Sequence, residues 1–227
     1  MDNLSADMRD MLQEEGASLV GYAEMGSVYE ACRDHPYGVS IAVALPRDIA
    51  RQIQPGPTPA YYAAYGRING ELARLCGRCV DFLKSRGYLA STMPPTIRGE
   101  GDTAPIPHKT AATRSGLGWI GKSALLITRE YGPAIRLGTV LTDAALDIGT
   151  PVKESRCGTC MECVRACPGQ AVKGVNWQAG CAREDIYDAD ACRAAARAQA
   201  AQIGVDNTIC GICIGVCPWT KRYIRTR

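Results

Sequence analysis

The amino-acid sequence predicts an α+β fold in two parts. The first part is an α+β domain over residues 1–150, because helical and strand-like hydrophobic periods are mixed there. The second is a smaller cysteine-built domain over residues 151–227, because nine of the twelve cysteines lie between Cys157 and Cys217. A Pro-containing stretch at 148–155 marks the boundary.

The expected elements follow from local patterns. Apolar residues at three- and four-residue spacing predict a helix at 4–15, with Ser5 available as its cap, and a long helix at 60–86 that ends at Gly87. An Ala-rich stretch predicts a third helix near 188–203. The residues from 91 to 121 are rich in Pro and Gly and are expected to be irregular. Strands are expected at 18–25, 39–45, 123–128 and 134–142, the last two joined by a Gly-Pro turn at 132–133.

Bulk composition excludes several classes of protein. With 46% hydrophobic and 22% charged residues, the chain is an ordinary globular protein, and a net charge of +3 does not argue for nucleic acid or anionic lipid. The first fifteen residues hold no apolar core of a secretory signal, and no apolar run reaches the roughly 20 residues of a membrane span. We therefore expect a soluble cytoplasmic protein with no membrane partner, in which clustered cysteines serve metal or redox chemistry.

The first cysteine run has the spacing of bacterial ferredoxins. Cys157, Cys160, Cys163 and Cys167, followed by Pro168, form C-x2-C-x2-C-x3-C-P. In that arrangement three close cysteines bind one 4Fe-4S cluster, and the fourth binds the other cluster of a two-cluster protein. A single zinc site would need only four ligands and would leave the remaining cysteines unexplained.

The second run is one cysteine shorter and completes the prediction of two clusters. Cys210, Cys213 and Cys217 precede Pro218. If Cys217 completes the first cluster, the second needs a fourth ligand, for which Cys192 at the start of the Ala-rich helix is favoured and Cys181 remains the alternative. The predicted ligand sets are Cys157, Cys160, Cys163 and Cys217 for the first cluster, and Cys167, Cys192, Cys210 and Cys213 for the second.

A glycine motif precedes the cysteine runs. Residues 116–122, GLGWIGK, satisfy G-x-G-x-x-G, but the stretch before them is not strand-like and the one after them is. That order reverses the strand and helix of a dinucleotide-binding site. We therefore expect a tight turn that lets the backbone approach a flat ligand.

These motifs together resemble epoxyqueuosine reductase. The residues that carry the resemblance begin with Asp102-Thr103-Ala104-Pro105, with GLGWIGK starting fourteen residues after Asp102. Leu137-Gly138 and Thr142-Asp143 follow, then the first cysteine run, Asp188-Ala189 with Cys192, and finally Cys210-x2-Cys213-x3-Cys217-Pro218-Trp219.

The resemblance implies a cofactor and a reaction. It implies a nitroreductase-like N-terminal domain that holds cobalamin, joined to a bacterial-ferredoxin-like double 4Fe-4S domain that feeds it electrons. Asp102 matches the family's proton donor, and His108 in the same loop is either a second donor or a surface histidine. Implied partners are a small-molecule substrate or modified nucleoside and a low-potential electron donor such as a ferredoxin or flavodoxin. By analogy, the corrinoid would pack on the Gly-rich loop at Gly116, Leu117, Gly118, Trp119, Gly121 and Lys122.

Two departures from the family keep other interpretations open. The chain ends nine residues after Pro218, before the helical-repeat domain with which full-length members grip transfer RNA, which disfavours a tRNA substrate. Pro107-His108-Lys109 also replaces the family's usual acidic-basic-Pro stretch. The rival hypothesis is an electron-transfer protein, or an activator that reduces a corrinoid, without substrate chemistry of its own. A pocket that holds flavin or nothing is a third. Lys221, Arg222, Arg225 and Arg227 form a basic tail that is either solvated or a contact for an acidic partner.

Overall fold

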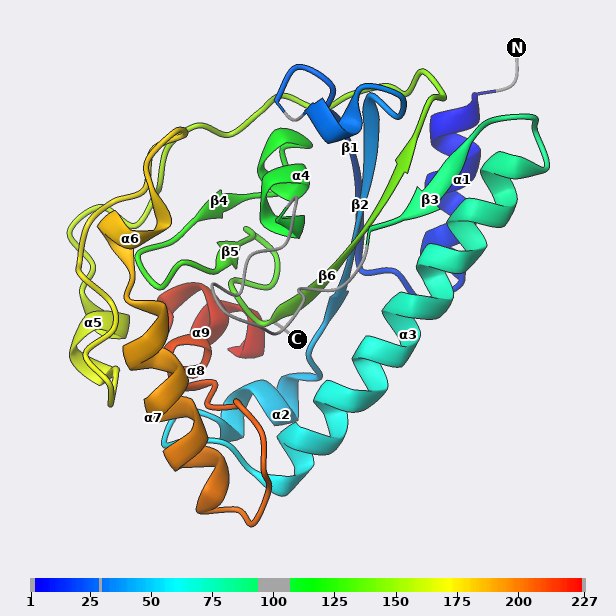
Figure 1. The fold of residues 1–227 in the computed structure, drawn as a ribbon. Coiled ribbons are helices and arrows are strands. Elements are labelled where there is room, and N and C mark those ends of the chain that lie inside the picture. Colours follow the sequence, from blue (N-terminus) through cyan, green and yellow to red (C-terminus); the bar gives the residue numbers. More distant parts are fainter. Residues whose placement is uncertain (1–2, 29, 94–106, 226–227) are drawn as a thin grey trace. The chain divides into compact units, whose positions relative to one another are not determined.

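The computed structural model describes residues 3–28, 30–93 and 107–225. The chain forms two compact units, and neither is a continuous segment. We call them the sheet unit and the cysteine unit, and Figure 1 shows the elements of both. The division of the chain at residue 150 stays a prediction. The sheet unit comprises Met1–Val43, Asn69–Leu117 and Arg136–Val152, and the cysteine unit comprises Ala44–Ile68, Gly118–Ile135 and Lys153–Arg227.

A four-stranded sheet organises the sheet unit. Its strand order is β1-β2-β6-β3, and the β1–β2 and β3–β6 pairs are antiparallel, with Leu19 opposite Ala42 and Ala90 opposite Thr142. The bounds are α1 Leu4–Glu14, β1 Leu19–Glu24, the 3-10 turn η1 Glu30–Cys32, β2 Tyr37–Ala44, β3 Ala90–Thr92, α4 His108–Arg114 and β6 Ile135–Thr142. Helix α3, Pro59–Lys84, starts in the cysteine unit and ends in the sheet unit.

Side-chain alternation along β1 explains how helices cover both faces of this sheet. The Tyr22 hydroxyl donates to the backbone carbonyl of Ser5 in α1 at 2.6 Å. A Cβ on the neighbouring Gly21 would lie 2.8 Å from the Ser115 hydroxyl, directly after α4. Successive residues of a strand face opposite sides, so α1 and α4 lie on opposite faces (Figure 1). An ion pair between Arg114 and Glu24, 2.7 Å long, also ties α4 to β1.

The cysteine unit is built from short helices and one two-stranded hairpin. The helix α2 packs against α8 and α9, and α5 packs against α8. The Tyr223 hydroxyl in α9 donates to the carbonyl of Leu45 at 2.8 Å, just before α2. The bounds are α2 Arg47–Gln52, β4 Trp119–Ile120, β5 Leu126–Ile127, α5 Glu162–Ala166, α6 Arg183–Ile186, α7 Ala189–Ala201, α8 Ile212–Gly215 and α9 Pro218–Arg225.

The structure corrects two sequence-based expectations. The stretch 123–128 does not pair with 134–142: its ordered part, β5, pairs with β4 in a separate sheet. A Cβ on Gly118 would lie 2.1 Å from the carbonyl oxygen of Ile127, so the missing side chain permits this hairpin. Asn3, and not Ser5, caps α1, with its side-chain oxygen accepting from the Ala6 N–H at 3.1 Å. Both differences depend on contacts that hydrophobic periodicity does not report.

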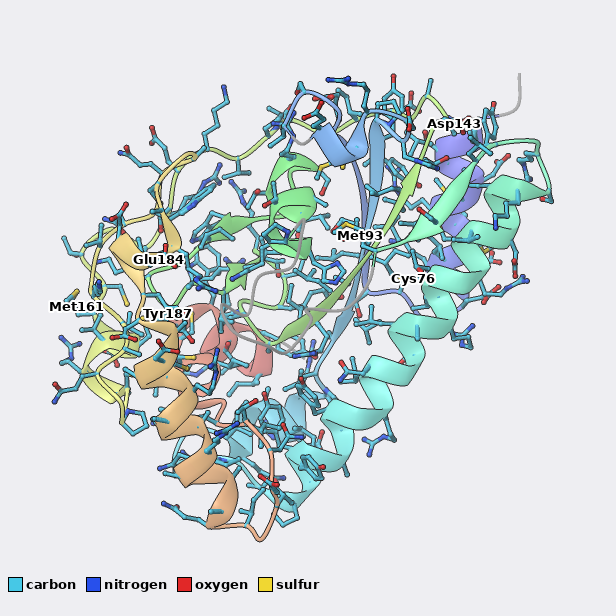
Figure 2. All side chains as sticks on the ribbon, viewed as in Figure 1. Cys76, Met93, Asp143, Met161, Glu184 and Tyr187 are labelled. Carbon is cyan, nitrogen blue, oxygen red and sulfur yellow. The ribbon has the colours of Figure 1, made fainter. Side chains whose placement is uncertain are left out.

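One further expectation holds. Gly87 ends α3 with a φ of 84°, a conformation that favours glycine. Cys76 (Figure 2) and Cys79 are both buried in α3, where the sulfur of Cys79 lies 3.5 Å from the sulfur of Met8. This environment is typical of cysteines that pack as small apolar residues. No helix among the described residues has both the length and the apolar character to span a membrane.

Candidate metal centre

Four thiols of the cysteine unit form one group, which we call the first cysteine set: Cys157, Cys160, Cys163 and Cys217. Charge interactions with Cys157 and Cys160 contribute to raising the pKa of Cys163, and interactions with Cys157 and Cys163 do the same for Cys217. Such interactions weaken with distance, so these thiols are neighbours. Cys163 lies in α5 and Cys217 immediately precedes α9, which brings together residues more than fifty positions apart.

Four other thiols form the second cysteine set: Cys167, Cys192, Cys210 and Cys213. Cys192 and Cys167 both raise the pKa of Cys210. Cys210, Cys192, Cys163 and Cys167 all act on Cys213, so this thiol lies near members of both sets. Cys181 is not among the groups that shift the pKa of Cys192 or Cys210. The grouping by proximity therefore favours Cys192 over Cys181 beside Cys167 and Cys210.

Burial is the main cause of the raised pKa values in both sets. It raises the pKa of Cys163 and of Cys217 to about 11, and it raises the pKa of Cys192, Cys210 and Cys213 as well. A buried thiol without metal therefore stays protonated at neutral pH. An iron-sulfur cluster binds thiolates, so cluster insertion has to release these protons.

Hydrogen-bond donors reach the sulfur atoms of both sets. Backbone N–H groups of Trp219 and Thr220, in the first turn of α9, lower the pKa of Cys217. In the second set, the Ala171 N–H donates to the sulfur of Cys167 at 3.3 Å. A side-chain hydrogen bond joins Tyr187 to Cys192; this bond and, above all, burial raise the pKa of Tyr187. These donors favour the thiolate form that a cluster needs.

Three buried side-chain donors have no hydrogen-bond partner among the described residues, Ser40 in the sheet unit and two in the cysteine unit. The two in the cysteine unit are the indole Nε1 of Trp119 and the hydroxyl of Thr220. Trp119 packs edge to face on Trp219 with ring centroids 5.1 Å apart, and Trp219 and Thr220 follow Cys217. Buried polar groups are normally satisfied, so unpaired donors beside the first cysteine set fit a site for an anionic group with acceptor atoms.

The chemistry of the donor set also fits a cluster better than a single ion. Among the described residues, no three His, Cys, Asp or Glu side chains converge closely enough to hold one metal ion. Each thiolate around a 4Fe-4S cluster binds a different iron, so its ligands surround a volume instead of meeting at a point. Two sets of four thiols, with donors aimed at their sulfur atoms, fit that requirement.

The Gly-rich loop packs closely on the protein's own atoms. In the sheet unit, a Cβ on Gly116, whose φ is 80°, would lie 2.9 Å from the carbonyl of Thr150, and Leu117 packs near Gly21 of β1. In the cysteine unit, Gly118 lies against Ile127, and a Cβ on Gly121 would lie 2.3 Å from the Ile127 side chain and 3.4 Å from Cys157 Sγ. The three glycines therefore have reasons inside the protein to lack side chains, and by themselves they do not indicate a corrinoid face.

The last residues of the loop lie beside the first cysteine set. Lys122 is buried, and its Nζ donates to the Met161 sulfur at 3.4 Å. Its charge is among the groups that lower the pKa of Cys163. Figure 2 shows Met161 beside α5 and Tyr187 between α6 and α7. The corrinoid-binding role of Gly116, Leu117, Gly118, Trp119, Gly121 and Lys122 stays a prediction.

The two predicted proton donors have different outcomes. Asp102 lies outside the described residues. His108 begins α4, and its Nδ1 lies 2.9 Å from the hydroxyl of Thr139 in β6. Burial, followed by the charge of Arg136, lowers the pKa of His108, so its ring is neutral at pH 7.

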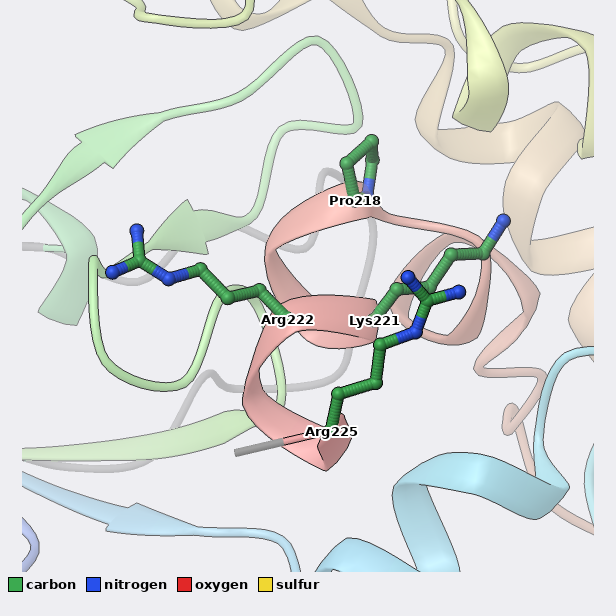
Figure 3. A pocket seen from close by; sticks show the side chains of 4 residues that line it. All are labelled: Pro218, Lys221, Arg222 and Arg225. Atoms are coloured by element: carbon green, nitrogen blue, oxygen red, sulfur yellow. The ribbon is translucent and has the colours of Figure 1, made fainter. Parts of the chain in front are cut away.

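A basic pocket lies on α9 directly after the first cysteine set. It is lined by Pro218, Lys221, Arg222 and Arg225 (Figure 3). Lys221 and Arg225 reach toward the same side of the helix, and Arg222 reaches the other way, with its guanidinium carbon 5.8 Å from the centre of the Trp219 ring. Arg227 of the predicted basic tail lies outside the described residues.

Sequence patterns missed the residues that surround the sulfur atoms. Tyr187 and Thr220 belong to no motif, and Met161 is one of the unspecified positions of the first cysteine run; each is close in sequence to a cysteine of a predicted set. A search for polar or sulfur-containing side chains within five positions of each predicted ligand would have found them. It would not have found Lys122, which lies thirty-five positions before Cys157.

Comparison with known proteins agrees with a double 4Fe-4S site and identifies related reductases. The family model described as a 4Fe-4S double cluster binding domain matches residues 156–220. The epoxyqueuosine reductase of Synechocystis sp. is 35% identical over 132 residues, 54% of this chain and 42% of that protein. The tetrachloroethene reductive dehalogenase of Desulfitobacterium hafniense is 27% identical over 229 residues, 95% of this chain and 39% of that protein. The chain thus spans about two fifths of these relatives' length.

Solved structures share the fold. A reductive dehalogenase structure described as suggesting a mechanism for B12-dependent dehalogenation matches with a TM-score of 0.73 and 18% identity, covering 94% of this chain and 31% of that one. The Bacillus subtilis epoxyqueuosine reductase matches with a TM-score of 0.64 and 17% identity, covering 96% and 65%. The chain is therefore a homologue of epoxyqueuosine reductase over about half of its length and carries a 4Fe-4S double cluster binding domain at residues 156–220.

Proposed function

We propose that this chain is an iron-sulfur oxidoreductase that passes electrons through two 4Fe-4S clusters to a cobalamin, which reduces a small oxidised substrate of the epoxide type. The observation that carries the proposal is the gathering of eight cysteines in one compact unit, within the segment that matches a 4Fe-4S double cluster binding domain. The proposed ligands are the first cysteine set for one cluster and the second cysteine set for the other. Side by side, two such clusters form a path for single electrons.

Cobalamin as the electron acceptor is supported by the relatives. A homologous class acts by B12-dependent dehalogenation, and another reduces epoxyqueuosine. When bound, a corrinoid cobalt couples one-electron delivery to a two-electron reduction of substrate. We place it in the sheet unit, which we propose to be nitroreductase-like, near the Gly-rich loop.

The reaction fixes what the protein has to supply. Removal of an epoxide oxygen as water forms a carbon-carbon double bond and consumes two electrons and two protons. The clusters deliver the electrons one at a time, and we propose Asp102 as a proton donor to the leaving oxygen. The Bacillus subtilis epoxyqueuosine reductase has an aspartate catalytic loop, which supports an aspartate in this role. Burial lowers the pKa of His108, and a neutral imidazole is a weaker acid than an imidazolium, which favours Asp102 as the donor.

The partners follow from the same chemistry. A low-potential one-electron carrier such as a ferredoxin or flavodoxin supplies the electrons, and Lys221 and Arg225 offer a basic face to an acidic carrier. One related structure contains an epoxyqueuosine-modified tRNA stem loop. A modified nucleoside, free or within RNA, is thus a proposed substrate class.

Anaerobic reconstitution tests the proposal in two stages. The chain should contain about eight irons and eight sulfides, the content of two 4Fe-4S clusters. After incubation with cobalamin and gel filtration, the visible spectrum should retain a corrinoid band that co-elutes with protein. Reductive turnover of an epoxide substrate should then fall strongly in Asp102→Asn. An iron content near four, or full turnover in that variant, would contradict the corresponding part of the proposal.

The alternative is an electron carrier without substrate chemistry. The basic face on α9 is the observation that favours it, because it adjoins Cys217 and suits an acidic redox partner. In that case the chain would hold two clusters and exchange electrons with a corrinoid protein, but would retain no free cobalamin on gel filtration. The same column run therefore separates the two functions.

A further inference from the structure

Lys122 is a buried cation beside the first cysteine set. Only 4% of this residue is exposed, and its Nζ donates to the thioether sulfur of Met161 at 3.4 Å. Met161 directly follows Cys160. Gly121 precedes Lys122, and a Cβ on Gly121 would lie 3.4 Å from Cys157 Sγ. The backbone and the side chain of this dipeptide thus both border the same set of thiols.

A buried ammonium group in this position needs a negative partner. Thioether sulfur is a weak acceptor, and no carboxylate among the described residues forms an ion pair with Lys122. Burying an unpaired charge costs much more than burying a paired one. The first cysteine set is a potential anion beside it, because Met161 lies between Cys160 and Cys163 and the neighbouring Gly121 borders Cys157.

A ligated cluster would provide that anion. Four thiolates outweigh the positive charge of the 4Fe-4S core, so the cluster with its ligands is negative, and its one-electron reduction adds another negative charge. A fixed cation nearby stabilises the reduced state more than the oxidised state, which raises the reduction potential. In the second cysteine set, no cation is among the main groups that shift the pKa of Cys192, Cys210 or Cys213.

We propose that Lys122 is the counter-ion of the first cluster and raises the reduction potential of that cluster above the potential of the second. Lys122 is a positioning residue in this role, since it acts on the electron and not on substrate. The inference rests on the proposed ligand sets and is independent of cobalamin and of the substrate. Its consequence is a direction for electron flow, from the second cluster to the first.

A redox titration tests this inference on the full chain. The protein is reconstituted anaerobically with iron and sulfide, then reduced stepwise with dithionite while electron paramagnetic resonance follows each cluster. Lys122→Met keeps the length and removes the charge, and Lys122→Arg retains it. Lys173→Gln is the matched control: it also removes one positive charge from the cysteine unit, but at an exposed position.

The expected result is selective. Lys122→Met should disfavour reduction of one cluster about tenfold, a shift of about 59 mV for one electron, and leave the other cluster unchanged. Lys122→Arg should stay close to the unchanged protein, and Lys173→Gln should shift neither potential. Equal shifts of both clusters, or none in a Lys122→Met protein with full iron content, would overturn the inference.

Two additional outcomes are also decisive. The Cys192→Ala protein should retain only the first cluster. Adding Lys122→Met to this protein should shift the reduction potential of the remaining cluster. If Lys122→Met shifts only the cluster that Cys192→Ala removes, the inference is wrong. If Lys122→Met cannot hold the first cluster, retention by Lys122→Arg supports a requirement for charge, and loss in both variants contradicts it. Cobalamin retention enters none of these readouts, so failure of the proposed cofactor is distinguished from failure of this inference.

Discussion

Each cysteine set provides four thiols, but the two sets have different surroundings. Beside the first set lie the Lys122 ammonium, the backbone N–H groups at the start of α9 and the indole of Trp119, which has no acceptor within the described part of the chain. Beside the second set lie the Tyr187 hydroxyl and the backbone N–H of Ala171. Both sets therefore offer the same type of ligand, four cysteine sulfurs, while the charges around these sulfurs differ between the sets. The potential of a cluster depends on both, so the difference predicts two clusters that are reduced at different potentials.

The largest expected effect tests membership of the second set. Cys192→Ala should lower the iron content from about eight to about four per chain, because a cluster that loses a buried ligand is not retained. Cys181→Ala is the matched control and should keep about eight irons, since Cys181 does not act on the thiols of this set. Iron and sulfide assays after anaerobic gel filtration measure both. The reverse pattern would place Cys181 in the site and remove the distinction drawn between the two sets.

A matched pair of glycines compares the rigidity of the two sets. Gly158 follows Cys157 and Gly211 follows Cys210, and both have positive φ, 54° and 88°. No atom lies within 4 Å of a Cβ on Gly158, whereas a Cβ on Gly211 would lie 2.9 Å from the Tyr61 ring.

Alanine at each position separates backbone strain from packing. Gly158→Ala should destabilise the protein by about 1 kcal/mol, the cost of the left-handed conformation alone. Gly211→Ala should cost at least about 2 kcal/mol, because overpacking adds to the strain. Thermal denaturation followed by loss of the cluster absorbance measures the difference. Equal stability of the two variants would show that the Tyr61 ring moves aside without cost, and would contradict the predicted overpacking at Gly211.

The smallest expected effect concerns Tyr187. Tyr187→Phe removes the hydroxyl that bonds with Cys192 and keeps the ring. Loss of a donor destabilises the reduced cluster, so the potential of the second cluster should fall by on the order of 20–40 mV. The first cluster should not respond. If the potential of the first cluster shifted instead, Cys192 would belong to that cluster, and the same redox titration would detect this.

Periodicity predicted the regular elements well where they were long. Residues of α1, α3 and α7 have the apolar spacing or alanine content that favours helices in most contexts, and their positions agree with the expectation to within a few residues. The pairing of short strands did not follow, because two residues of β5 carry too little pattern to choose between β4 and β6. A close approach at Gly118 and a turn around Gly132 decide that choice.

The sequence by itself determined the ligand chemistry. Cysteine spacing is a local property, since three thiols within seven residues have to lie close together whatever the rest of the chain does. Spacing also predicted Cys217 for the first set, but it left Cys192 and Cys181 as alternatives for the second. The tertiary structure brings Cys217 to Cys157 and Cys192 to Cys210. It also decided the charge around them: Lys122 reaches the first set through the β4–β5 hairpin, and electrostatic interactions depend on distance in space, which no spacing in the sequence records.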